Sequence, residues 1–167
     1  MATPTVSFFN ASAGTNSALL VDWMTQLQSM LFAKGWTLEY ADSDAIGGSL
    51  DPSTPAWDKT PAANTDAGVA VYRMPANDHD TRWYVRLRPG WAANTDRPHM
   101  RGVTLGTTHD GSGGISGAGS ELAPIVTTTQ TDNRQVLIAC SEDGFALLLP
   151  ITSAAIIVIV ERARRSD

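Results

Sequence analysis

The alternation of hydrophobic and polar residues between positions 82 and 107 predicts two neighbouring β-strands. Successive side chains of a strand point to opposite faces, so a period of two indicates a half-buried strand. In the first of the two strands, one face carries Trp83, Val85 and Leu87. The other face carries Arg82, Tyr84, Arg86 and Arg88. Pro89 and Gly90 are predicted to end this strand, because proline lacks a backbone donor and glycine accepts turn conformations. The short β-branched run 101–107 predicts its neighbour.

A different spacing, of three and four residues, predicts one helix from Ser17 to Ala33. The apolar positions that carry this pattern are Leu19, Leu20, Trp23, Leu27, Met30 and Leu31. Gly35 follows as the residue that ends the helix in a left-handed conformation. The alternating segment 36–40 comes directly after it and predicts a strand. We expect the helix to lie across the sheet and cover its apolar face.

Further strands are predicted over 69–74, 134–140, 144–149 and 155–162. The pair Asp143-Gly144 indicates a tight hairpin between the second and third of these. The last strand is almost entirely aliphatic, which favours a place in the centre of the sheet. The pattern therefore predicts an α+β fold: a mainly antiparallel β-sheet or sandwich of about seven strands, covered by one N-terminal amphipathic helix.

The length of 167 residues is typical of one domain with a hydrophobic core. We expect an N-terminal arm over residues 1–14, with Phe8 and Phe9 available for docking, and a single domain over residues 15–167. Two long loops are predicted, at 42–67 with Trp57 as its one large apolar residue, and at 108–121, where glycine is frequent and flexibility is expected. A shorter predicted loop, 89–100, carries Trp91.

The fraction of charged residues, the net charge and the length of the apolar blocks indicate which kinds of partner to expect. Charged residues make up 17% of the chain, below the usual value of about 25%, which suits a subunit packed against others. The net charge of −5 argues against a nucleic-acid partner, because phosphate binding needs a positive field. The longest apolar block, 154–160, is too short to span a membrane, and the N-terminus shows no secretory signal, so no membrane partner is expected.

Candidate chemistry is sparse. Cys140 lies in an apolar run and is interpreted as a small core residue. The histidines at 79, 99 and 109 lie on separate predicted loops without the spacing of a metal site, and are interpreted as solvent-facing. The glycine-rich loop lacks a nucleotide-binding fingerprint. We therefore predict no catalytic residue, no cofactor and no metal, and a protein that is not an enzyme.

The arginine-rich face has two interpretations. Arg82, Arg86 and Arg88 surround Tyr84, with Arg73 expected on the adjoining strand. Arginine and tyrosine are enriched at protein interfaces, which favours a contact with another subunit. The alternative is a solvated strand face whose charges pair across to Glu39 or to other carboxylates.

Four segments give the chain a resemblance to small virion structural proteins of tailed bacteriophages: Gly35 to Thr37, Trp83 to Gly90, Gly106 to Gly111, and Ile156 to Arg164. The resemblance implies a repeated component of the virion, made in the bacterial cytoplasm, whose partners are copies of itself and other virion proteins. It implies no catalytic residues. Within the particle we favour the tail or neck, with capsid decoration as one alternative.

A second alternative is a carbohydrate- or receptor-binding module, in which exposed Trp57 and Trp91 would stack on sugar rings. Across these hypotheses, the candidate interface residues are Phe8, Phe9, Trp57, Arg82, Tyr84, Arg86, Arg88 and Trp91.

Overall fold

The computed structural model describes residues 5–11, 16–41, 69–76, 82–92, 97–117, 134–151 and 154–161. Side chains are described for residues 24–41, 69–76, 82–89, 102–117, 138–147 and 159–160. The predicted loop 42–67, with Trp57, lies outside the described residues.

These residues form two four-stranded antiparallel sheets, a small hairpin and one helix. Sheet A has the order β1 (Thr5–Ala11), β8 (Arg134–Cys140), β9 (Gly144–Ile151) and β10 (Ala154–Glu161). Sheet B has the order β2 (Thr37–Ala41), β3 (Ala70–Arg73), β4 (Tyr84–Ala92) and β5 (Arg97–Gly106). The hairpin pairs β6 (Thr108–His109) with β7 (Ile115–Ser116), and the helix is α1 (Asn16–Ala33).

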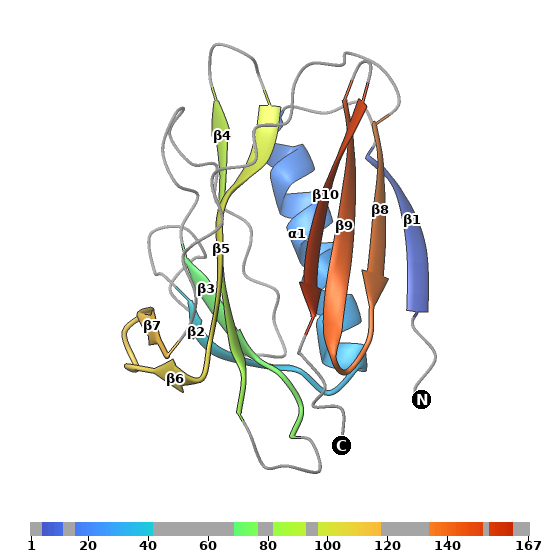
Figure 1. Cartoon of the computed structure of the whole chain (residues 1–167). Helices are drawn as coiled ribbons and strands as arrows, with labels where there is room; N and C mark the ends of the chain where they lie inside the picture. The colour runs from blue at the N-terminus through green and yellow to red at the C-terminus, as the bar shows by residue number, and fades with distance from the viewer. Residues whose placement is uncertain are drawn as a thin grey trace.

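Helix α1 lies between the two sheets (Figure 1), where it contacts β1 and β8 of sheet A and β4 and β5 of sheet B. The buried core joins all three layers: it includes Leu27 from the helix, Leu87 from sheet B and Leu147 from sheet A, all fully buried. The predicted α+β class with antiparallel sheets is confirmed. The helix, however, packs against two sheets rather than covering a single face. No helix in the described ranges is long and apolar enough to cross a membrane.

The end of α1 follows the prediction closely. Gly35 has a positive φ of 81°, and its amide donates to Phe32 O at 2.9 Å. The next amide, that of Trp36, reaches back to Leu31 O at 3.1 Å. These two hydrogen bonds form a Schellman motif, which satisfies carbonyls at the end of the helix and turns the chain into β2.

The predicted end of a strand at Pro89 is wrong. Strand β4 continues through Pro89 and Gly90 to Ala92, and stays paired with β5. The pairing shifts between Arg88 and Pro89, so that Arg101 of β5 has no register partner. A bulge of this kind is where a strand tolerates proline, since the ladder is already interrupted there.

The two ends of sheet A also differ from the prediction. Residues 5–11 of the predicted arm form β1, an edge strand that is paired with β8 along its whole length. Strand β10 was expected in the centre of its sheet, but among the described residues it pairs with β9 alone and forms the opposite edge. An aliphatic strand indicates that both its faces meet apolar groups; it does not determine whether both its edges are paired.

The predicted hairpin between β8 and β9 is confirmed. Its turn is closed by the amide of Ser141, which donates to Gly144 O at 2.8 Å. The Ser141 hydroxyl in turn accepts a hydrogen bond from the amide of Asp143 at 3.2 Å.

Candidate functional site

The predicted alternation along β4 is confirmed. Val85 and Leu87 are fully buried, and Trp83, just before the strand, packs against the core. On the opposite face Arg82 is exposed, whereas Tyr84, Arg86 and Arg88 are half-buried. We call this opposite face the outer face of sheet B, because it points away from α1.

The structure describes one ion pair on the arginine-rich face. Arg73 Nε lies 2.9 Å from Glu39 Oε1 and also donates to Thr37 Oγ1 at 3.2 Å. Arg73 therefore follows the alternative of pairing across to Glu39. A partly exposed ion pair of this type contributes only about 0–1 kcal/mol, so it holds the edge of the sheet weakly.

The β6–β7 hairpin forms a second layer on the outer face of sheet B. Its His109 ring lies 5.7 Å from the ring of Tyr84 and 6.2 Å from that of Tyr40, between centroids. A Cβ added at Gly113, whose φ is 91°, would come within 2.8 Å of the Tyr40 ring. Part of the predicted 108–121 loop is thus a paired hairpin, and the prediction that His109 faces solvent is wrong, because His109 is half-buried. Aromatic packing holds His109, because two tyrosines of distant strands flank it.

A small polar cluster lies on the same outer face. Val71, the register partner of Arg86 on β3, is fully buried, although it is not part of the main core. On the other side Arg86 is the register partner of Thr104 on β5, which is 9% exposed. Arg86 Nε, Thr104 Oγ1 and His109 Nε2 are buried without a hydrogen-bond partner in the described structure. Each such group costs about 1–3 kcal/mol.

Asp110 organises the tip of the hairpin. Its Oδ1 accepts hydrogen bonds from the amides of Ser112, at 2.7 Å, and Gly114, at 2.9 Å. These two backbone donors lower the pKa of Asp110 below its ordinary value, since they stabilise the carboxylate. The carboxylate thus serves the turn of its own hairpin.

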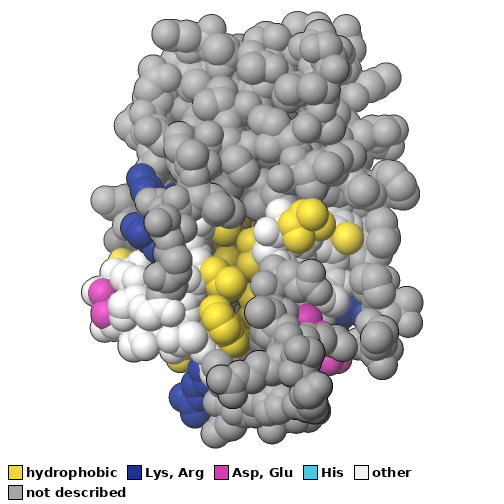
Figure 2. Space-filling view, in the orientation of Figure 1, with side chains coloured by type: hydrophobic (Ala, Val, Ile, Leu, Met, Phe, Trp, Pro, Cys, Tyr) yellow, Lys and Arg dark blue, Asp and Glu magenta, His cyan; other side chains and the backbone are white. Residues whose placement is uncertain are grey.

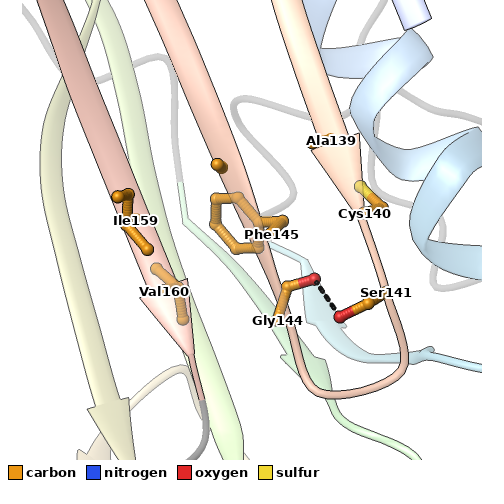
Figure 3. Close-up of a pocket in the computed structure, with 8 residues that line it drawn as sticks. Ala139, Cys140, Ser141, Gly144, Phe145, Ile159 and Val160 are labelled. Atoms are coloured by element: carbon orange, nitrogen blue, oxygen red, sulfur yellow. Dashed lines mark hydrogen bonds between the residues drawn. The ribbon is translucent and has the colours of Figure 1, made fainter. Parts of the chain in front are cut away.

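A second surface feature lies on sheet A, over the turn between β8 and β9 (Figure 3). Ile159 of the edge strand β10 is 63% exposed and pairs in register with Ala146, which pairs with Ala139. A shallow pocket of about 160 Å³ is lined by Ala139, Cys140, Ser141, Gly144, Phe145, Ala146, Ile159 and Val160. Figure 2 shows apolar side chains at the surface over this sheet.

Cys140 borders this pocket but is only 1% exposed, as predicted for a core residue. Burial raises the pKa of its thiol from 9.0 to about 12, against the opposing influence of Lys34. A thiolate nucleophile is therefore disfavoured here.

We expect the native protein to react with a thiol reagent at pH 8 about a thousandfold more slowly than the unfolded chain, because so little thiolate forms. Cys140 also makes stability depend on pH. As the pH rises, the thiol ionises in the unfolded chain before it ionises in the folded protein. The stabilisation that the buried thiol gives the folded protein is therefore complete below pH 9 and is lost as the pH rises towards 12. Labelling rates in buffer and in denaturant measure the first effect, with Cys140→Ala as the blank. Equal rates would contradict it.

The remaining predicted interface residues are placed only by their backbone. Phe8 and Phe9 lie in β1, paired with Leu137 and Val136, and Trp91 lies in β4, paired with Pro98. The structure thus brings Tyr84 and Arg86 together with two residues that the sequence did not single out as site residues, Thr104 and His109. For Thr104 the only signal in the sequence was its place in a short predicted strand.

Comparison with known proteins gives no match to this chain among family models, curated proteins or solved structures. Within the described residues, no group of three or more His, Cys, Asp or Glu side chains lies close enough to hold a metal ion.

Proposed function

We propose that this protein is a non-enzymatic structural subunit of a tailed-phage virion, most suited to the tail or neck, that acts by protein–protein assembly. The phage assignment rests on the sequence resemblance of the four segments that include 83–90 and 156–164. The observation that carries the assembly function is the exposed Ile159 on edge strand β10, next to an apolar pocket.

The surface around Ile159 suits a protein partner. Ala139 and Ala146 continue the same row across β8 and β9, and their short side chains let another backbone approach closely. An isoleucine that gains complete burial contributes about 1.5–3 kcal/mol relative to an exposed one. An edge strand also offers backbone donors and acceptors for pairing with another chain. Side-chain burial and strand pairing at one place are what a subunit contact requires.

The alternative of a carbohydrate- or receptor-binding module depends on Trp57 and on the side chain of Trp91, both of which lie outside the described structure. Capsid decoration would use the same kind of contact surface. The assembly function on sheet A is therefore the one that the described surface favours.

Replacing Ile159 with aspartate should weaken self-association by about tenfold or more, because the new charge would have to be desolvated in the contact. Light scattering coupled to size exclusion, over a range of protein concentrations, measures the mass. We expect a discrete oligomer for the wild type and a shift towards monomer for Ile159→Asp. Ser29→Asp, at an exposed position of α1, is the matched control and should leave the mass unchanged.

A wild-type monomer at all concentrations, or an Ile159→Asp variant with unchanged mass, would contradict self-assembly through this surface. The phage assignment has a separate test. An antibody against the protein should label purified virions at the tail or neck in electron micrographs, and labelling of the shell alone would move the assignment to capsid decoration.

A further inference from the structure

We propose that the outer face of sheet B and the β6–β7 hairpin form a binding site for an anionic oxygen group, built from Arg86, Thr104 and His109. The site is separate from the assembly surface on sheet A. Its ligand chemistry is that of an oxyanion, supplied either by a free tetrahedral anion such as phosphate or by a carboxylate of a second copy of this chain.

The strand register places Arg86 beside Thr104, and a ring contact places His109 beside Tyr84, the neighbour of Arg86 on this face. Arg86 and Thr104 are direct partners across β4 and β5, so their Cβ atoms lie about 4.5–5.5 Å apart. Tyr84 is the next residue of β4 on the same face, and its ring contacts that of His109, 5.7 Å away. Three different elements therefore contribute to the site: β4, β5 and the hairpin.

The chemistry of the three atoms points to an acceptor with negative charge. Arg86 Nε is always a donor, the Thr104 hydroxyl can donate, and His109 Nε2 donates in one neutral tautomer and in the imidazolium form. All three are buried without a partner in the described structure. Hydrogen bonds from such groups to an ionised oxygen are stronger than neutral ones, and one oxyanion can accept several.

Two described carboxylates on this side of sheet B, those of Glu39 and Asp110, are engaged elsewhere. Glu39 pairs with Arg73 and accepts a hydrogen bond from Thr37 Oγ1 at 2.9 Å. Asp110 accepts two backbone amides of its own turn, from Ser112 and Gly114. Among the described residues, neither carboxylate is bonded to the Arg86 side chain, so an external anion would complete the site.

A ligand can approach the site from the surface, because Arg86 and His109 are both half-buried and reach the surface in part. The hairpin keeps its own backbone hydrogen bonds, in which Thr107 N donates to Ser116 O and Asp110 N to Gly114 O, each at 3.1 Å. Its His109 ring packs on sheet B between Tyr40 and Tyr84.

Titration of the ¹⁵N-labelled protein with inorganic phosphate at constant ionic strength tests the site. We expect saturable shifts of the amides of residues 106–117. Arg86→Gln and Thr104→Val should each raise the dissociation constant about tenfold or more, since each removes one donor. Arg82→Gln, an exposed arginine just before the same strand, is the matched control and should change it less than about twofold. Thr104→Val keeps the shape of the side chain, so it remains informative if Arg86→Gln misfolds.

Sulfate and acetate, titrated in the same way, distinguish the two sources. Binding of phosphate and sulfate but not acetate supports a free tetrahedral anion. Binding of acetate, with a loss of concentration-dependent association in Arg86→Gln, supports a carboxylate of a second copy. A wild type without saturable shifts for any of the three, as expected if water alone occupies the site, overturns the proposal. The proposal is also overturned if Arg86→Gln and Thr104→Val both bind phosphate with the same dissociation constant as the wild type. Ile159→Asp should bind phosphate as the wild type does, so a failure of the assembly function leaves this test intact.

Discussion

Replacing Trp36 with alanine should lower the free energy of unfolding by about 3–5 kcal/mol, the largest single loss that we expect in this protein. Trp36 is 2% exposed and stands between the end of α1 and the start of β2. Its ring meets that of Phe145 edge-on, 6.1 Å between centroids, and its indole N–H donates to Ser141 O at 2.9 Å. One side chain thus links the helix end and sheet B to the β8–β9 turn of sheet A.

The loss of stability expected for Trp36→Ala has two parts that can be measured separately. Loss of the indole leaves a cavity where the three layers meet, and it leaves Ser141 O without its donor. Trp36→Phe keeps much of the ring but removes the donor, so it should cost about 1–3 kcal/mol. Urea unfolding followed by far-ultraviolet circular dichroism measures both variants, since fluorescence would change with the tryptophan itself. If Trp36→Ala cost no more than Trp36→Phe, packing at this junction would not be the main contribution.

The parts of the fold that the sequence predicted correctly are those governed by local rules. The helix was expected over 17–33 and is found over Asn16–Ala33, because its apolar spacing and Gly35 are local signals. The hairpin at Asp143-Gly144 was recognised for the same reason. Both features depend on residues within a few positions of each other.

The errors share a different cause: each depended on a partner distant in sequence. Pro89 does not end β4, because β5 supplies a bulge opposite it. Segment 5–11 becomes a strand because β8, more than 120 residues later, pairs with it. Among the described residues β10 is an edge strand, since position in a sheet follows from the connections and not from side-chain character.

In the candidate site, too, the features that depend on residues distant in sequence were not predicted. Alternation placed Tyr84 and Arg86 on one face, which was confirmed. His109 was expected in solvent, because a histidine beside glycines and Asp110 is typical of a surface turn. Its true surroundings depend on two tyrosines from β2 and β4. The buried state of Thr104 likewise appears only in the assembled structure.

The hydrogen bond between Tyr72 and Gln28 should contribute measurably to stability. Tyr72 Oη donates to Gln28 Oε1 at 2.5 Å, and the two residues are 0% and 1% exposed. The bond joins β3 to α1 in the core, where loss of either partner leaves a buried polar group without this contact. We expect Tyr72→Phe and Gln28→Leu each to cost about 1–3 kcal/mol.

The double variant decides whether the cost comes from the bond itself. Removing both polar groups leaves neither without its partner, so the combined loss should be smaller than the sum of the single losses by about 1–2 kcal/mol. Tyr72→Phe keeps the ring contact with Phe32, 6.4 Å between centroids, so the cycle isolates the hydroxyl. Tyr72→Phe combined with Thr108→Ala, on the distant exposed hairpin, serves as the control and should be additive. Additive losses for Tyr72 and Gln28 as well would show that helix α1 is held on sheet B by apolar packing, with no net contribution from this bond.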